Sequence, residues 1–290
     1  MIHYVKLIRP QQWIKNLFIF IPPFFAGVLF NSKTLIEGTI GLISFSLVAS
    51  AVYILNDLKD IEVDRAHPAK KYRPLASSRI SKQAAVALLA LFSLTGLGLG
   101  FWLNKEFGYV ITGYFLLNIG YCFGLKKVAI LDMLIVALGF VLRTIAGGFI
   151  AEVAISQWLL IMIFLLSFFL AIAKRRDDIL LQETSGVSVR KSTEKYNLDF
   201  INAAMTMIST IMIMAYIMYT ISEEVIERIG FEHLYLTSIF VLSGIMRYLQ
   251  MALVENKTSS PVRILYTDRF IQSVLVLWVL SFIFIIYWHA

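Results

Sequence analysis

Acidic and amide side chains that could hold a metal ion are concentrated between positions 56 and 64, directly after a long apolar segment. If this stretch is helical, Asn56, Asp60 and Asp64 lie at i, i+4 and i+8, and Asp57 falls beside them. Without a partner, such a row of oxygen ligands would repel itself. A Mg²⁺ ion bound to a few carboxylates and to substrate phosphates would neutralise it. We therefore predict a magnesium site here; the alternative is a solvated charged loop between two membrane helices.

A second polar stretch, residues 174–199, begins with bases rather than acids. Lys174, Arg175 and Arg176 come first, and Asp177 follows them. Arginine offers bidentate contacts to phosphate, so this group is a candidate phosphate cradle. The alternative is that these residues anchor a helix at the membrane–water boundary and contact lipid head groups.

Two charged residues share a third apolar segment. Asp132 and Arg143 are eleven positions apart, close to three helical turns, so they lie on one helix face. At ~1.5 Å rise per residue they are roughly 16 Å apart and cannot pair, so each needs its own partner. An arginine deep in a membrane span is costly unless it faces a polar cavity or an anion. The alternative is a structural ion pair between helices.

The N-terminal region carries a further candidate. Trp13 and Lys15 stand where the first apolar segment begins. An aromatic anchor beside a lysine whose head reaches the interface explains this pair well. The other interpretation places Lys15 in a binding site.

The elements that must position these residues are membrane helices. The chain is 59% hydrophobic with a mean hydropathy of +0.76, more apolar surface than a soluble domain could hide. We predict an all-α fold, a polytopic membrane helical bundle with about nine transmembrane helices around a central cavity open to the cytoplasm. Residues 1–290 form a single domain in this prediction. The segments long enough to cross a ~30 Å hydrocarbon layer are 14–30, 35–55, 83–103, 107–125, 129–150, 156–173, 200–221, 234–254 and 270–289.

Charge predicts the orientation of these segments. Most of the 26 Lys and Arg residues fall before the first segment or after the even-numbered ones. Only Lys33, Lys105 and Arg228 fall in the other connections. The positive-inside rule then places the N-terminus and the polar loops in the cytoplasm and the C-terminus outside, in a multi-pass protein of the cell inner (plasma) membrane. The net charge of +7 is a topology signal and predicts no nucleic-acid partner.

Other chemistries find little support in the sequence. There is no Ser/His/Asp arrangement, and the single Cys122 excludes an internal disulfide and a Cys-based metal site. Gly96, Gly98 and Gly100 resemble a dinucleotide fingerprint but lie inside a membrane span, where close helix packing is the better explanation. The charged groups therefore predict one cytoplasmic pocket with an acidic metal half and a basic anion half.

The acidic motif carries a family resemblance. Asn-Asp-x-x-Asp-x-x-x-Asp at 56–64, with Arg-Pro-Leu at 73–75, resembles the first signature of the UbiA superfamily of intramembrane prenyltransferases. That resemblance implies nine transmembrane helices and binding of a diphosphate through Mg²⁺. The segments 9–16, 131–143, 174–176, 190–192 and 261–269 resemble the branch of phosphoribosyltransferases that act on decaprenyl phosphate.

This branch implies a glycosyltransferase that moves 5-phosphoribose from 5-phosphoribosyl 1-diphosphate to a polyprenyl phosphate and so serves cell wall biogenesis. A second loop rich in bases rather than acids favours it, because the lipid then brings a phosphate that carries no metal. The resemblance implies Asp57, Asp60 and Asp64 as catalytic residues and magnesium ligands together with Asn56. The expected substrate-binding residues are Lys15, Asn16, Lys70, Arg73, Lys126, Arg143, Lys174, Arg175, Arg176, Asp177 and Arg190.

Two other functions remain open at this stage. A prenyltransferase of the ordinary UbiA type would move a prenyl group from a prenyl diphosphate to an aromatic or other acceptor. A transporter fits less well, because the charges gather at one face rather than in the middle of the membrane. The sequence leaves the oligomeric state open, and a homo-oligomer is compatible with it.

Overall fold

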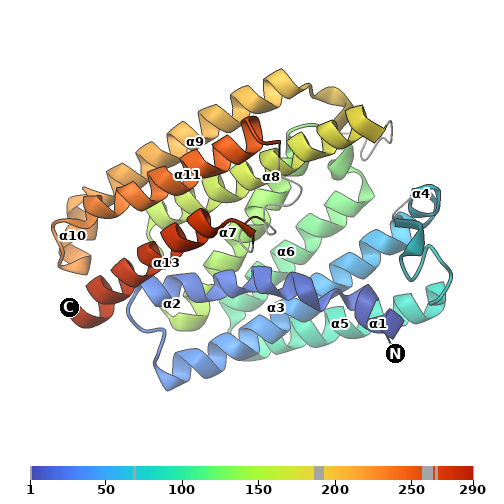
Figure 1. Cartoon of the computed structure of the whole chain (residues 1–290). Coiled ribbons are helices and arrows are strands. Elements are labelled where there is room, and N and C mark those ends of the chain that lie inside the picture. Colours follow the sequence, from blue (N-terminus) through green and yellow to red (C-terminus); the bar gives the residue numbers. More distant parts are fainter. Residues whose placement is uncertain (1, 68–69, 186–192, 257–263, 265–266, 290) are drawn as a thin grey trace. The chain divides into compact units, whose positions relative to one another are not determined.

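The structure is a computed structural model, and it describes residues 2–67, 70–185, 193–256, 264 and 267–289 (Figure 1). Every regular element in these ranges is a helix, which confirms the predicted all-α class. The chain divides into two compact units, Met1–Lys126 with Leu138–Ile155 and Lys127–Ala137 with Ser156–Ala290. Each unit is described by itself.

Unit 1 is built around a long helix that ends at the acidic motif. This helix, α3, packs lengthwise against α5 and also contacts α6 and the N-terminal segment η1 (Figure 1). The elements are α1 (Ile2–Ile8), the 3₁₀ segment η1 (Pro10–Phe20), α2 (Ile21–Phe25), α3 (Ser32–Lys59), α4 (Ile61–Ala66), the 3₁₀ turn η2 (Lys70–Tyr72), α5 (Lys82–Leu103), α6 (Lys105–Phe123), the 3₁₀ turn η3 (Leu125–Lys127) and most of α7 (Leu131–Ala151).

Local sequence signals explain where these helices begin and how closely they approach. Ser81 and Asn104 cap α5 and α6, since each side chain accepts a hydrogen bond from the backbone N–H three residues later. A Cβ on Gly96 of α5 would lie 2.9 Å from the carbonyl oxygen of Ser44 in α3. Only glycine allows that approach, and the Ser44 hydroxyl donates to the Gly96 carbonyl at 2.7 Å. Close helix packing is therefore confirmed at Gly96.

The N-terminal segment η1 departs from the predicted membrane helix. It is a 3₁₀ helix of 11 residues, although such runs rarely exceed about four residues. Arg9 precedes it in the left-handed region, with φ 57° and ψ 57°, and Pro10 opens it. A Cβ on Gly147 of α7 would collide with the carbonyl of Ile19, so the small residue lets α7 lie directly against η1.

Unit 2 is a second set of packed helices. Within it, α9 lies against α8 and α11, and α13 lies against α11 (Figure 1). Its core gathers large apolar residues such as Phe169, Ile201 and Met205, all fully buried. The elements after the first turns of α7 are α8 (Gln157–Ser185), the 3₁₀ turn η4 (Thr193–Lys195), α9 (Leu198–Thr220), α10 (Glu223–Ile229), the 3₁₀ turn η5 (Leu234–Thr237), α11 (Ser238–Leu253), α13 (Arg269–Phe284) and the π-helical end η6 (Ile285–His289).

The described residues contain seven helices that are long and apolar enough to cross a membrane. They match seven of the nine predicted segments, so the count of nine is not confirmed. The first predicted segment, 14–30, is instead formed largely by η1 and the five-residue helix α2, and Pro22 and Pro23 stand in the first turn of α2. The segment 107–125 corresponds to α6, which is not among the seven. The central cavity and the membrane orientation stay predictions.

Candidate active site

The acidic motif stands where α3 gives way to α4. Helix α3 ends at Lys59, and Asp60 adopts φ −99° and ψ 8° before α4 begins at Ile61. Two backbone hydrogen bonds continue across this junction, from the Asp60 N–H to the Asn56 carbonyl and from the Asp64 N–H to the Asp60 carbonyl. The helical spacing is thus kept, and the predicted residues remain neighbours although the regular helix is broken.

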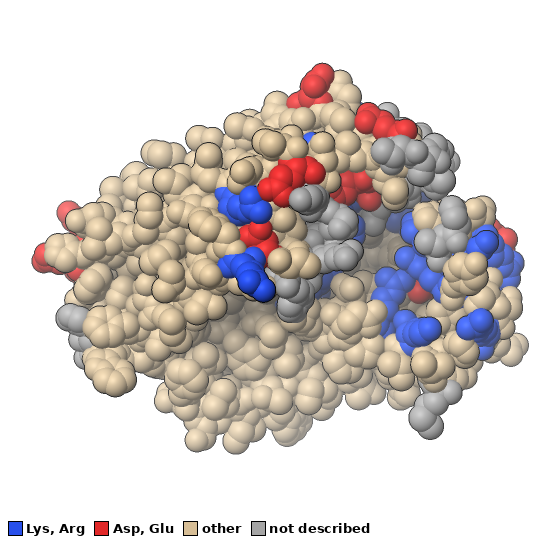
Figure 2. Space-filling view, viewed as in Figure 1, with Lys and Arg blue, Asp and Glu red and all other residues tan. Residues whose placement is uncertain are grey.

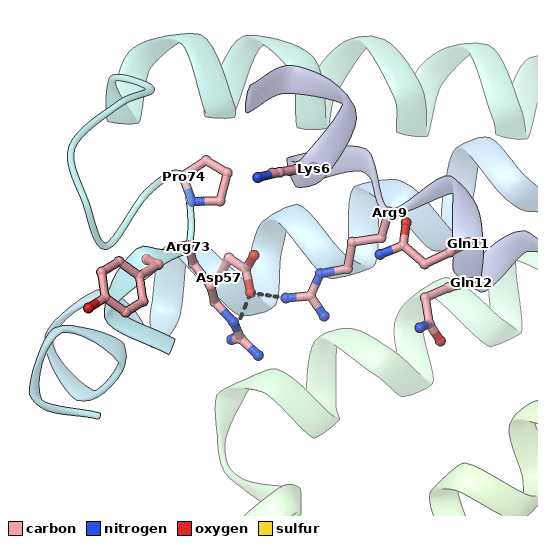
Figure 3. Close-up of a pocket in the computed structure, with 8 residues that line it drawn as sticks. Lys6, Arg9, Gln11, Gln12, Asp57, Arg73 and Pro74 are labelled. Atoms are coloured by element: carbon pink, nitrogen blue, oxygen red, sulfur yellow. Dashed lines mark hydrogen bonds and ion pairs between the residues drawn. The ribbon is translucent and has the colours of Figure 1, made fainter. Parts of the chain in front are cut away.

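Arginines bind two of the carboxylates (Figure 3). Arg9 donates through Nη2 to Oδ1 of Asp57 at 2.6 Å. Arg73 donates through Nη1 to the same Asp57 oxygen at 3.1 Å and to Oδ2 of Asp64 at 2.7 Å. Asp57 and Asp64 are almost fully buried, whereas the two arginine side chains are 21% and 28% exposed. The charge of both acids is therefore neutralised by cations that remain within reach of solvent.

A lysine binds the other two members of the motif. Lys126, just after α6, donates to both carboxylate oxygens of Asp60 at 2.6 and 2.7 Å and to Oδ1 of Asn56 at 3.1 Å. The motif is thus divided into two pairs, each bridged by a cation. These basic side chains offset the repulsion that the sequence predicts between the carboxylates.

A pocket of about 320 Å³ opens beside the motif. Three of its lining residues are cations, Lys6, Arg9 and Arg73, and Asp57 is the only acid among them (Figure 3). Figure 2 shows basic side chains gathering at the end of unit 1 that carries α1 and α4, whereas the flank formed by α3 and α5 is largely apolar. The full lining set is Lys6, Arg9, Gln11, Gln12, Asp57, Tyr72, Arg73 and Pro74.

Most of these lining residues were not among the predicted site residues. Lys6, Arg9, Gln11, Gln12 and Tyr72 escaped notice because they lie far from the acidic motif in sequence or carry no obvious ligand chemistry. A signal was available for Arg9, Gln11 and Gln12, which lie in the segment 9–16. The Arg-Pro dipeptide at 9–10 belongs to the N-terminal segment that carried the family resemblance, and the structure brings it to the motif.

Arg143 lies buried in α7 and is held by neutral groups. It donates to Oδ1 of Asn16 at 2.7 Å, to the Gly139 carbonyl at 2.7 Å and to the hydroxyl of Tyr114 at 3.0 Å. Its guanidinium also lies 4.9 Å from the ring centre of Phe45 and 4.7 Å from that of Tyr114. No acid among the described residues pairs with Arg143, so the predicted alternative of a structural ion pair is not seen. Aromatic faces and polar acceptors stabilise this charge instead.

The basic group of unit 2 is arranged differently. Arg175 pairs with Asp132 at 2.7 Å and with Asp178 at 3.0 Å, and both Arg175 and Asp132 are at most 2% exposed. Arg176 is also buried and donates to the amide oxygens of Asn202 at 2.8 Å and Asn256 at 2.7 Å. Asp132 and Arg143 thus have separate partners, as their spacing required. The ion pairs give Arg175 a structural role within unit 2.

The remaining predicted residues fall in several settings. Lys15 and Lys70 are half-buried in unit 1, Lys174 is exposed on α8 and Asp177 is half-buried there. Arg190 lies outside the described residues.

The hydroxyl of Tyr196 gives unit 2 a further link around Asp132. It accepts the backbone N–H of Ile130 and lies 3.4 Å from Oδ1 of Asp132. Burial, with a smaller effect of the neighbouring Asp132 carboxylate, raises the pKa of Tyr196 above its ordinary value, so the phenol keeps its proton at neutral pH. A protonated hydroxyl can donate to the carboxylate and helps to fix it.

The donor set of the acidic motif fits a magnesium ion shared with a ligand. Among the residues that the structure describes, no three His, Cys, Asp or Glu side chains form a metal site by themselves. Magnesium in phosphate-handling sites is commonly bound by one or two carboxylates, with substrate phosphates and water as the other ligands. Each half of the motif offers such carboxylate oxygens. The motif therefore suits joint binding of Mg²⁺ and a phosphate compound better than a closed protein cage.

Comparison with known proteins identifies the family to which this chain belongs. The model of the UbiA prenyltransferase family matches residues 20–226, more than half of the chain. The chain therefore belongs to the UbiA prenyltransferase family, and it is a multi-pass membrane transferase.

Two curated relatives of this chain are phosphoribosyltransferases. The chain is 35% identical over 224 residues to decaprenyl-phosphate phosphoribosyltransferase of Mycolicibacterium smegmatis, covering 76% of this chain and 70% of that protein. It is 31% identical over 289 residues to the enzyme of the same name from Corynebacterium glutamicum, covering 98% and 86%.

A solved structure supports the fold. The UbiA homolog from Archaeoglobus fulgidus bound to GPP and Mg²⁺ has a TM-score of 0.74 and 19% identity, with 98% of this chain and 99% of that chain covered. A likeness at this identity concerns the fold alone. It agrees with a polytopic, all-helical membrane protein.

Proposed function

We propose that this protein transfers 5-phosphoribose from 5-phosphoribosyl 1-diphosphate to a polyprenyl phosphate of the decaprenyl type. The products are polyprenylphosphoryl-5-phosphoribose and diphosphate. The names of the relatives support the reaction class over nearly the whole chain. The observation that carries the proposal is the acidic motif, whose carboxylates are shared among the cations Arg9, Arg73 and Lys126.

The motif suits a substrate that brings both negative charge and a metal. Asn56, Asp57, Asp60 and Asp64 would hold Mg²⁺, which neutralises the diphosphate and makes it a better leaving group. Arg73 and Lys126 lie on the same carboxylates, so they are at hand for phosphate oxygens that do not contact the metal. Guanidinium and ammonium groups preorganised in this way stabilise charge that develops on a departing diphosphate.

The chemical step needs no strong base. An oxygen of the lipid phosphate attacks C1 of the ribose, the new C1–O bond forms, and the bond from C1 to the diphosphate oxygen breaks. The diphosphate leaves with the electron pair of that bond. A phosphate monoester loses its second proton at a pKa of about 6, so the attacking oxygen is already anionic near neutral pH. The task of the protein is to align the two substrates and to exclude water.

The other substrate-binding assignments rest on charge and position. Lys15 and Asn16 lie on η1, next to the buried Arg143, and are assigned to the lipid phosphate side. Lys70 lies four residues beyond α4 and is assigned to the sugar diphosphate. The remaining candidates for binding a substrate phosphate are Lys174, Arg175, Arg176, Asp177 and Arg190. Arg175 is the weakest candidate among them, because Asp132 and Asp178 already bind its side chain.

The proposed location is the plasma membrane, with the motif and the N-terminus on the cytoplasmic side. The distribution of lysine and arginine along the sequence supports this orientation. A water-soluble donor would then reach the motif from the cytoplasm, and the lipid would enter from the bilayer.

One assay tests the proposal. Purified protein is incubated with 5-phosphoribosyl 1-diphosphate labelled in the ribose, a polyprenyl phosphate and Mg²⁺, and the lipid fraction is extracted and counted. We expect a labelled lipid and an equal amount of diphosphate. A parallel incubation uses a labelled prenyl diphosphate with aromatic acceptors. Product in the second incubation alone would replace the proposal with the ordinary prenyltransferase reaction.

A further inference from the structure

The pocket beside the acidic motif has an excess of positive charge. Lys6, Arg9 and Arg73 face one carboxylate in the lining, Asp57, and Arg73 also pairs with Asp64 outside it, so three cations exceed two acids by one charge. A phosphate monoester carries about −1.5 to −2 charges at neutral pH, so this positive excess favours it. The pocket volume of about 320 Å³ lies within the range of roughly 300–1,000 Å³ that small-molecule sites occupy.

The guanidinium groups retain donors for a ligand. Arg9 contacts Asp57 through Nη2 alone, and Arg73 contacts both Asp57 and Asp64 through Nη1 alone. Arginine has five N–H donors in a planar fork that suits phosphate oxygens. Lys6 is exposed at the rim, and no acid among the described residues pairs with it. Figure 3 shows the guanidinium groups of Arg9 and Arg73 approaching Asp57 from two different segments of the chain.

Arg9 is held in place by an unusual local conformation. Its backbone lies in the left-handed region, at φ 57° and ψ 57°, between α1 and the long 3₁₀ segment η1. Such a conformation is strained for a residue other than glycine and tends to occur at functional sites. The guanidinium also lies 5.2 Å from the ring centre of Tyr53 on α3. The strained turn and the aromatic face together fix a cation at the pocket wall.

We propose that Lys6, Arg9 and Arg73 form a subsite for a phosphate monoester, the 5-phosphate of the sugar donor, which makes the enzyme specific for a phosphorylated ribose. This inference rests on the proposed function. It assigns the soluble substrate to the N-terminal pocket through residues that the acidic motif alone did not indicate, above all Lys6 and Arg9.

The lining chemistry separates this ligand from the two other phosphates of the reaction. The lipid phosphate carries a long apolar tail, whereas the described lining residues include Gln11 and Gln12, and Pro74 is the only aliphatic residue among them. The diphosphate with its metal is assigned to the acidic motif as a whole, where Asn56, Asp60 and Asp64 add oxygen ligands, whereas Asp57 is the only acid among the described lining residues. Asp57 belongs both to the pocket lining and to the acidic motif, so the proposed monoester and the metal-bound diphosphate would lie side by side.

Binding measurements with the intact protein test the subsite. Ribose 5-phosphate, ribose, magnesium diphosphate and a short-chain polyprenyl phosphate are titrated separately into wild type, Lys6→Gln and Arg9→Gln, and the thermal shift of each is recorded. Lys82→Gln is the matched control, because Lys82 is an exposed lysine of unit 1 outside the pocket. We expect ribose 5-phosphate to stabilise wild type and Lys82→Gln, and ribose to do nothing.

Loss of one charged hydrogen bond should weaken ribose 5-phosphate binding about tenfold in Lys6→Gln and more in Arg9→Gln. The shifts by magnesium diphosphate and by the lipid should persist in Lys6→Gln. If Lys6→Gln instead weakens only the lipid or only the diphosphate, or if it binds all ligands as wild type does, the assignment is overturned. Arg9→Gln removes a partner of Asp57, so Lys6→Gln decides the matter if that variant folds poorly. The turnover assay is separate: absence of labelled lipid with intact, charge-dependent ribose 5-phosphate binding would refute the reaction but not the subsite.

Discussion

The two charged regions of this protein use similar residues in opposite ways. In unit 1, Lys126 and Asp60 remain 16% and 25% exposed, and they lie in a cluster whose cations are shared between acids. In unit 2, Arg175 and Asp132 are 2% and 0% exposed. The first arrangement can exchange partners when a charged ligand arrives. The second is closed, and a ligand could use Arg175 only by breaking a buried pair.

The physical reason lies in solvation. A buried ion pair loses the hydration of both charges, and removal of one partner leaves an uncompensated charge that costs about 3–5 kcal/mol. Such a pair fixes the helices that carry it, here α7 and α8 within unit 2. A partly exposed pair is worth only about 0–1 kcal/mol. It is therefore a poor structural element but a good binding element, because little free energy opposes its opening.

The largest effect should come from the acidic motif. We expect Asp60→Asn to lower turnover more than about a hundredfold, because loss of even an outer partner of a metal ligand costs about 10–100-fold. Glu62→Gln is the matched control, since Glu62 is an exposed acid between the motif residues and, among the described residues, pairs with Arg65. The measurement is the rate of lipid labelling at saturating Mg²⁺. Equal rates for the two variants would remove Asp60 from the site.

Replacing one cation in each region by methionine separates a structural ion pair from one that is available for ligand binding. Arg175→Met should destabilise the protein by about 3–5 kcal/mol, and Lys126→Met by only about 1 kcal/mol. Turnover should follow the reverse order per folded molecule, with Lys126→Met the slower enzyme. Thermal unfolding in detergent and the labelling rate are measured on the same preparations. A stable Arg175→Met with a raised KM for either substrate would restore the phosphate role of Arg175.

Arg143 represents an intermediate case, a buried cation with neutral partners. We expect Arg143→Lys to cost about 1–3 kcal/mol of stability, because an ammonium group cannot reach Asn16, Tyr114 and the Gly139 carbonyl together. Asn16→Leu should cost a similar amount, and the double variant should cost less than the sum of the two, since they share one contact. Strict additivity in thermal unfolding would show that the contact between Arg143 and Asn16 contributes nothing.

Much of the fold could be predicted from the sequence because membrane helices are long and strongly patterned. Seven predicted segments coincide with helices apolar enough to span a bilayer. One of the two exceptions is the segment 14–30, whose composition is apolar but whose backbone is a 3₁₀ helix followed by the short helix α2. Hydropathy reports burial in lipid and is silent on the hydrogen-bond pattern, so composition alone could not reveal this difference.

The candidate site was only partly accessible from the sequence. The i, i+4 spacing gathered Asn56, Asp60 and Asp64, because that relation is local. The partners of these residues lie from 9 positions away, for Arg73 and Asp64, to 66 positions away, for Lys126 and Asp60, and no periodicity predicts them. Arg9 shows the same limit. Its role depends on a left-handed turn that no propensity favours in arginine, so tertiary contacts had to fix it.

The smallest effect should come from an ion-pair network of unit 2, where the side chain of Arg247 binds the buried Asp268 at 2.8 Å and Glu255 at 2.7 Å. The hydrogen bond from Arg247 holds the pKa of Asp268 below its ordinary value of 3.8. A carboxyl whose pKa is lower in the folded state contributes stability that is fully present well above pH 3.8 and is lost as the pH falls through and below that value.

Asp268 also caps α13 by accepting the Ile271 N–H at 2.9 Å, and asparagine can keep that bond. We therefore expect Asp268→Asn to melt slightly below wild type at pH 7 and together with it near pH 3. A melting difference that stays constant from pH 7 to pH 3 would show that the charge of Asp268 does not stabilise the fold.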